Sequence, residues 1–185
     1  MSRTFSMWAV ALMLTAGTAF ASSADAARKD LQVVKDVAAS VERYTQFTIF
    51  DDVSAEVNDG VVTLTGRVTM PFKRDEIAKR VGKLDGVREV RDQIEVLPVS
   101  QWDDELRYRI AASIYNNSNF WNYAAMANPP IHIVVERGRV TLTGVVQSNV
   151  DRMLAQSLAT RFGAFSVTNA LKTDAEVRDA LDESE

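Results

Sequence analysis

The chain has 185 residues, a formal net charge of −4 at pH 7 and no cysteine. The lack of cysteine excludes disulfides, thiolate metal sites and a cysteine nucleophile. The mildly acidic balance argues against a dedicated nucleic-acid-binding protein, which would carry a basic surface.

Residues 1–26 have the layout of a secretory signal peptide. Arg3 gives a positive start, residues 5–16 are apolar, and small residues follow, with cleavage expected near residue 21 or 26. The apolar run is shorter than the ~20 residues that a membrane span needs. We therefore expect export to the periplasm, with an uncleaved membrane anchor as the weaker alternative.

The remaining chain repeats itself. Three blocks recur in the same order, offset by 73 to 78 residues: 37–43 and 110–116, 62–66 and 140–144, and 86–94 and 163–171. The second pair shares the identical run Val-Thr-Leu-Thr-Gly. A constant order at a nearly constant spacing indicates a tandem duplication.

Each repeat predicts the same elements in chain order. In the first, Val33, Val37 and Val41 recur at helical spacing. Alternating apolar residues on either side of the turn residues Asn-Asp-Gly then predict a β-hairpin over residues 53–68. A helix from Pro71 to Gly86 and a last strand over residues 87–96 complete the unit.

This order predicts an α+β fold of two tandem αββαβ units, each a small three-stranded mixed sheet covered by two helices. The expected boundaries are a first domain at 29–97, a linker at 98–103, a second domain at 104–173 and an acidic tail at 174–185. The sequence leaves open whether the tail is helical.

Glycine occupies the same place in both predicted hairpins, at Gly66 and Gly144. A glycine inside a strand marks a bulge or the close approach of another backbone. We expect a helix crossing the sheet at this point, in preference to a ligand site.

The pattern Gly-x-Val-x-Leu-x-Gly-x-Val, a helix, and then Gly-Val-x-x-Val-x-[Asn/Asp]-x-[Ile/Leu] resembles the BON domain of bacterial envelope proteins. Its glycines are Gly60, Gly66, Gly86, Gly138, Gly144 and Gly163. Asp92 stands at the position where asparagine is more usual. The resemblance implies a periplasmic, non-enzymatic binding module associated with phospholipid membranes, envelope integrity and osmotic stress.

The residues offer no constellation typical of catalysis. His132 is the single histidine and alternates with apolar neighbours, so we expect it at the surface. No metal-ligand spacing and no nucleophile elbow occurs, and Asp103 or Asp104 is expected to help start a helix. We therefore expect no enzyme activity, no cofactor, no metal, no small-molecule substrate and no nucleic-acid partner.

Two features could carry binding. The predicted helix 71–86 places four basic residues on one side and apolar residues on the other: Lys73, Lys79, Arg80 and Lys83. A cationic stripe beside an apolar one suits an anionic phospholipid surface, and an ordinary solvated helix face is the alternative.

The second feature is an aromatic group in an extra segment of the second repeat, formed by Phe120, Trp121 and Tyr123. Exposed, these rings would suit a lipid–water interface or a protein partner; buried, they would cap the core. Two functions stay open: a module on anionic phospholipid surfaces, or a soluble chaperone-like or protein-interaction module of the cell envelope.

Overall fold

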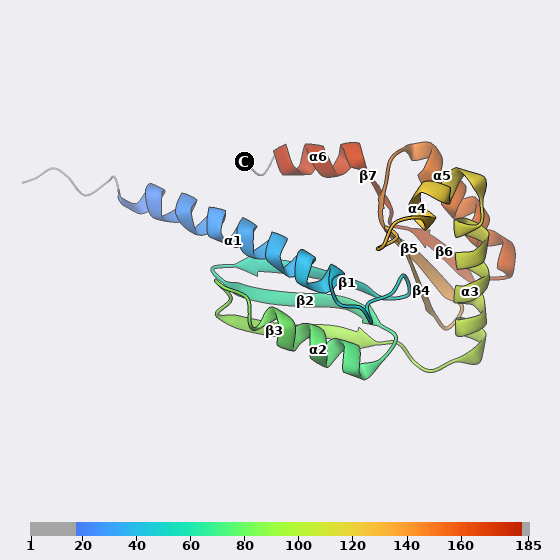
Figure 1. Ribbon diagram of the computed structural model, residues 1–185, viewed down its shortest axis with the longest axis horizontal. Helices are drawn as coiled ribbons and strands as arrows, with labels where there is room; N and C mark the ends of the chain where they lie inside the picture. Colours follow the sequence, from blue (N-terminus) through green and yellow to red (C-terminus); the bar gives the residue numbers. More distant parts are fainter. Residues whose placement is uncertain (1–17, 183–185) are drawn as a thin grey trace, which may run out of the picture.

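The computed structural model describes the backbone of residues 18–182 and the side chains of residues 29–180. It confirms the predicted α+β fold of two successive units, each with two helices on one face of a mixed sheet (Figure 1). Most of the predicted signal peptide lies outside the described residues. Among the described residues, no helix combines the length and the apolarity that crossing a membrane requires.

The first unit has a three-stranded sheet in the order β1-β2-β3. Strand β2 is central, antiparallel to β1 and parallel to β3. The α2 helix ends before the predicted Gly86, because Gly82 already caps it. The elements are α1 (Thr18–Glu42), β1 (Asp52–Asn58), β2 (Val61–Val68), α2 (Pro71–Val81) and β3 (Glu89–Val96).

The second unit follows the same plan, with one difference in its sheet. Its sheet has four strands, because the final strand is interrupted at Ala170 and Leu171. The interruption separates β6 (Ser166–Asn169) from β7 (Lys172–Thr173), and both run parallel to β5. The other elements are α3 (Gln101–Tyr115), η1 (Ser118–Phe120), α4 (Trp121–Ala124), β4 (Ile131–Glu136), β5 (Arg139–Val146), α5 (Asn149–Ala159), η2 (Thr160–Phe162) and α6 (Asp174–Asp182).

One expectation at the element ends needs correction, and one open question is answered. The predicted linker is shorter than expected, because the Ser100 hydroxyl accepts a hydrogen bond from the Asp103 N–H and starts α3 at Gln101. The tail, on which the sequence was undecided, forms α6. Its first turn is a capping box, in which Thr173 and Glu176 each accept from the other's backbone N–H.

Each unit buries its own apolar core between helices and sheet. In the first unit, Val33, Val37 and Val41 of α1 pack with Ile77 and Val81 of α2 over the inner sheet face. In the second unit, larger residues of α3 (Leu106, Ile110, Ile114) replace the three valines, whereas Ala155 and Ala159 of α5 replace Ile77 and Val81. Burying one such side chain contributes about 1.5–3 kcal/mol, so these clusters dominate the stability of each unit.

A carboxylate in the first helix ties that helix to the hairpin turn in both units. Asp30 accepts from the N–H groups of Asp59 and Gly60 at 2.8 and 2.9 Å. Buried Asp103 accepts from Arg137 and Gly138, both at 2.8 Å. The Asp103 side chain therefore holds the hairpin, whereas Ser100 starts the helix.

The glycines in the hairpins are required by a neighbouring strand. A Cβ atom on Gly66 would lie 2.1 Å from the carbonyl oxygen of Asp52, and one on Gly144 would lie 1.8 Å from that of Pro130. Both glycines have positive φ, +118° and +110°. The predicted crossing helix is wrong, because the close backbone belongs to the chain that enters the hairpin.

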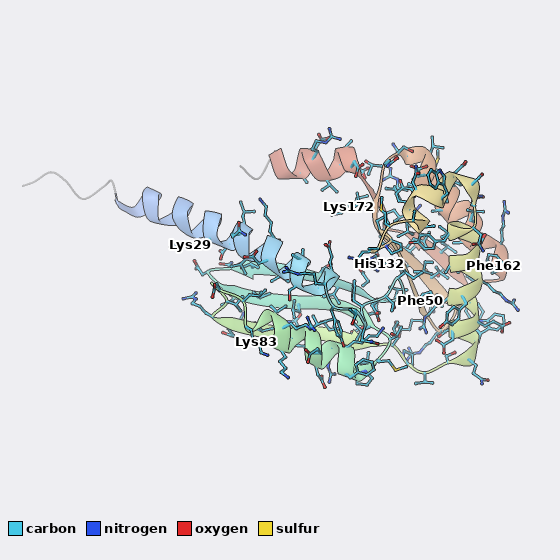
Figure 2. The ribbon with its side chains drawn as sticks, viewed as in Figure 1. Lys29, Phe50, Lys83, His132, Phe162 and Lys172 are labelled. Carbon is cyan, nitrogen blue, oxygen red and sulfur yellow. The ribbon has the colours of Figure 1, made fainter. Side chains whose placement is uncertain are left out.

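The two units contact each other through the segment between α1 and β1. The Ile133 N–H of β4 donates to the Ile49 carbonyl at 2.7 Å, and Phe50 packs against the second core. His132 is half-buried in this joint, with Nδ1 2.6 Å from the Asp51 carbonyl (Figure 2). The expectation of a free surface histidine is therefore wrong.

Candidate functional site

The predicted cationic stripe loses one member, because Lys73 lies inside the first unit. Its side chain is only 5% exposed, and Nζ donates to Asp51 Oδ2 at 2.6 Å and to Thr69 Oγ1 at 2.8 Å. Lys73, Ile77 and Val81 are spaced by four residues, so they share the buried face of α2. Lys73 is a structural cation and does not belong to the exposed stripe.

Asp51 is the centre of this buried network. Its carboxylate accepts from the N–H and hydroxyl of Thr48, from the N–H and hydroxyl of Thr69, and from Lys73. Burial by itself raises the pKa of Asp51, but the bonds from Lys73, Thr69 and Thr48 outweigh it and hold the pKa below its ordinary value. All of these partners are internal, so the network supports the fold and is no ligand site.

The second unit fills the equivalent space with a neutral group. The Tyr123 hydroxyl accepts from the Gln147 N–H at 2.8 Å, as Asp51 accepts from Thr69 in the first unit. It donates to Asp151, which stands at the position of Lys73 in the repeat. Burial raises the pKa of Tyr123 above its ordinary value. The backbone N–H that follows the second strand is thus bound by a buried carboxylate in the first unit and by a tyrosine hydroxyl in the second.

Replacing Tyr123 with phenylalanine is expected to destabilise the protein by about 1–3 kcal/mol, because the Gln147 N–H loses its partner in a largely buried place. Urea unfolding followed by circular dichroism measures this. Tyr108→Phe, at an exposed tyrosine of α3, serves as the control and should change stability by less than about 0.5 kcal/mol. Equal stability of the two variants would contradict the assigned role.

The part of the stripe that reaches the surface consists of exposed Lys79 and Lys83 and half-buried Arg80. Arg80 lies over the ring of Tyr44 at 4.8 Å and pairs with Glu76. Lys79 also reaches Glu76, at 3.8 Å. Lys83 lies past the C-terminal end of α2, on the end of the first unit remote from the second (Figure 2).

Phe72 extends this stripe, and sequence reasoning missed it. Phe72, Glu76 and Lys79 follow one another at three- and four-residue steps, so they form one line along α2, and Lys83 follows in the turn after the helix. Phe72 is 53% exposed. The sequence signal that could have identified Phe72 was its helical spacing from Glu76 and Lys79. We call Phe72, Lys79, Arg80 and Lys83 the α2 stripe.

The aromatic group of the second unit divides between core and surface. Phe120 and Tyr123 are buried, with ring centroids 5.7 Å apart. Trp121 begins α4 and is 66% exposed. The core reading therefore holds for two of the rings, and Trp121 alone remains available for an interface.

The Asn or Asp of the last strand has a structural role. Asp92 Oδ1 accepts from the Ile94 N–H at 3.0 Å, and Asn169 Oδ1 accepts from the Leu171 N–H at 3.3 Å. Each side chain thus satisfies a backbone donor along the outer edge of its sheet. Asn169 also donates to the Arg152 carbonyl of α5, whereas Asp92 faces Arg74 of α2 at 3.9 Å. In the first unit, the ion pair between Asp92 and Arg74 therefore takes the place of the hydrogen bond that the Asn169 amide donates in the second.

Within the described part of the chain, no group of three or more histidine, aspartate or glutamate side chains is arranged to hold a metal ion. The networks around Asp51 and Tyr123 are internal, whereas Lys79, Lys83, Phe72 and Trp121 lie on the surface.

The family model described as "BON domain" matches the chain twice, at residues 26–98 and 103–175. The search of curated proteins found no match. Among solved structures, the chain is similar to CdsD, a structural protein of the type III secretion system of Chlamydia trachomatis, at 15% identity and a TM-score of 0.30 over 80% of this chain and 97% of that one. A structure of the C-terminal domain of CdsD matches at 15% identity and a TM-score of 0.26, over 74% and 96%.

Proposed function

Since the chain belongs to the BON-domain family and carries two such domains in tandem, we propose that it is a periplasmic, non-enzymatic module that associates with anionic phospholipid membrane surfaces. In this role it supports envelope integrity or the response to osmotic stress. The predicted signal peptide supports export, and the protein then binds the membrane from outside the bilayer.

The α2 stripe is the observation that carries this proposal. It combines an exposed ring at the start of the helix with three cations towards its end. The carboxylate of Glu76 lies among these cations, and exposed Asp75 lies at their edge. A basic residue near an anionic surface contributes about 1 kcal/mol. An aromatic ring at the same level suits the interface between headgroups and acyl chains. On the buried face of the helix, Lys73 fixes α2 to Asp51 and so holds the stripe in place.

The second unit offers a weaker contact. Its matching helix α5 keeps Arg152, but this guanidinium binds Glu176 of α6 at 2.8 Å. Exposed Trp121 remains as an interfacial side chain. Because the joint holds the two units together, a second weak contact adds to the first through effective concentration.

Co-sedimentation with vesicles tests the proposal. The protein should bind phosphatidylglycerol vesicles in preference to phosphatidylcholine vesicles, and salt should weaken the binding. Replacing Lys79 and Lys83 with glutamate should reduce binding at least thirtyfold, because losing two contacts of about 1 kcal/mol already gives roughly that factor.

The matched control reverses two charges on the second unit, at exposed Arg161 and Lys172. It changes the net charge of the protein by the same amount and should leave vesicle binding nearly intact. Equal losses in both double variants would show that net charge governs binding, and retained binding after the α2 reversal would refute the α2 stripe as the membrane contact.

A further inference from the structure

Two adjoining cavities of about 270 and 400 Å³ lie at the joint between the units. They share the lining residues Glu42, Phe47 and His132. Figure 2 places the labelled His132 and Phe50 where the two units meet. Domain boundaries are frequent places for ligand sites, and no other feature described above uses this space.

The smaller cavity runs between a helix and a strand edge. Val34 and Ala38 of α1 form one side, and Val53 and Ala55 of β1 form the other. Strand β1 pairs with β2 along one edge, and no other strand of the described chain pairs with its second edge. A groove between a helix and an unpaired strand edge is the geometry in which an extended peptide joins a sheet as a further strand.

The residues that line the two cavities indicate which side chains a bound peptide should have. Apart from the half-buried His132, the ionisable residues around the two cavities are Glu42 and Asp52, both acidic. The rest of the smaller cavity is mainly aliphatic, with the ring of Phe47. Such a site disfavours an anionic lipid headgroup and favours an apolar side chain with a lysine or arginine beside it.

We propose that the groove between α1 and β1 binds an extended segment of a protein partner in which apolar and basic residues alternate. The segment pairs its backbone with the free edge of β1. One apolar side chain enters the space below Val34 and Ala38, and a neighbouring cation faces Glu42 and Asp52. His132, held by the Asp51 carbonyl, closes the groove at the second unit. This site is separate from the α2 stripe and goes beyond membrane association.

Fluorescence anisotropy of the whole protein with a labelled peptide Lys-Val-Lys-Phe-Lys-Val-Lys tests the inference. Ala38→Trp fills the groove from an exposed helix position and should weaken peptide binding at least tenfold. Lys35→Trp adds the same ring to α1 outside the lining and should change binding less than twofold. Glu42→Lys should also weaken binding, by at least threefold, and does so without adding bulk.

Two altered peptides test the chemistry. N-methylation of the backbone along one edge, with all charges kept, should abolish binding, because it blocks strand pairing. Replacing each lysine with glutamate should do the same, because of the acidic rim. Absence of binding by the original peptide, equal binding by either altered peptide, or unchanged binding in Ala38→Trp would each overturn the proposal. Vesicle binding by Ala38→Trp should equal that of the unmodified protein, so the peptide site and the membrane contact fail separately.

Discussion

Replacing Lys73 with methionine is expected to lower the free energy of unfolding by about 3–5 kcal/mol. The substitution keeps the buried hydrocarbon chain but leaves the Asp51 carboxylate buried without its cation. An uncompensated buried charge destabilises the fold strongly. The 2.6 Å contact and the almost complete burial of both side chains place this pair at the upper end of ion-pair effects. Urea unfolding followed by circular dichroism gives the difference directly.

Lys79→Met is the matched control, because it removes a lysine from the exposed face of the same helix. It should change stability by less than about 0.5 kcal/mol. The double variant Asp51→Asn with Lys73→Met should recover part of the loss, since it buries no unpaired charge. If Lys73→Met were no more destabilising than Lys79→Met, the buried pair would not contribute as described.

The same pair predicts a dependence of stability on pH. The pKa of Asp51 in the folded protein lies below its ordinary value of 3.8, so the unfolded chain takes up a proton first as the solution is acidified. The contribution of Asp51 is therefore complete above that ordinary value and is lost as the pH falls through the folded pKa. The stability difference between the unmodified protein and Asp51→Asn should shrink over this acidic range.

Replacing Gly66 with alanine is the second change with a large expected effect, a loss of about 3 kcal/mol or more. A Cβ atom would lie 2.1 Å from the Asp52 carbonyl oxygen, so β1 and β2 must separate locally. The positive φ of +118° adds strain for any residue with a side chain. Core overpacking and backbone strain each cost about 1–3 kcal/mol. Thermal unfolding should show the change as a clear fall in Tm.

Gly82→Ala tests whether the loss comes from geometry. Gly82 has a φ of −64°, and the nearest atom to an added Cβ is 3.4 Å away. Alanine should be neutral there, or stabilising by about 0.4–1 kcal/mol, because it restricts the unfolded chain. A Gly66→Ala protein as stable as Gly82→Ala would show that the strands tolerate a side chain at the close approach.

The fold was predictable because the sequence pattern of the unit occurs twice in the chain. Helical spacing at Val33, Val37 and Val41 and the alternation in the hairpin are local signals, and their recurrence in the second repeat made each interpretation firmer. The interrupted strand at Leu171 was not predictable in the same way. The matching Ile94 is also buried, but in an unbroken β3, so the repeated sequence pattern does not mark the interruption.

The errors at the candidate site have physical causes. Because lysine is rarely buried, Lys73 was predicted to lie at the surface. Its four-residue spacing from Ile77 places it on the buried face of the helix instead. The close approach at Gly66 was expected, but its source was not, because only the pairing of β1 with β2 brings the Asp52 carbonyl there. His132 finds its partner 81 residues earlier in the chain, a separation that no local pattern reveals.

The role of Asp51 in both a core and a joint has a consequence for cooperativity. Its carboxylate fixes the turn at Thr48, and its carbonyl and that of the nearby Ile49 contact β4 of the other repeat. Loss of order in the first repeat therefore removes part of the covering of the second core. We therefore expect the two halves to unfold in one cooperative transition, in which protonation of the Asp51 carboxylate lowers the stability of both.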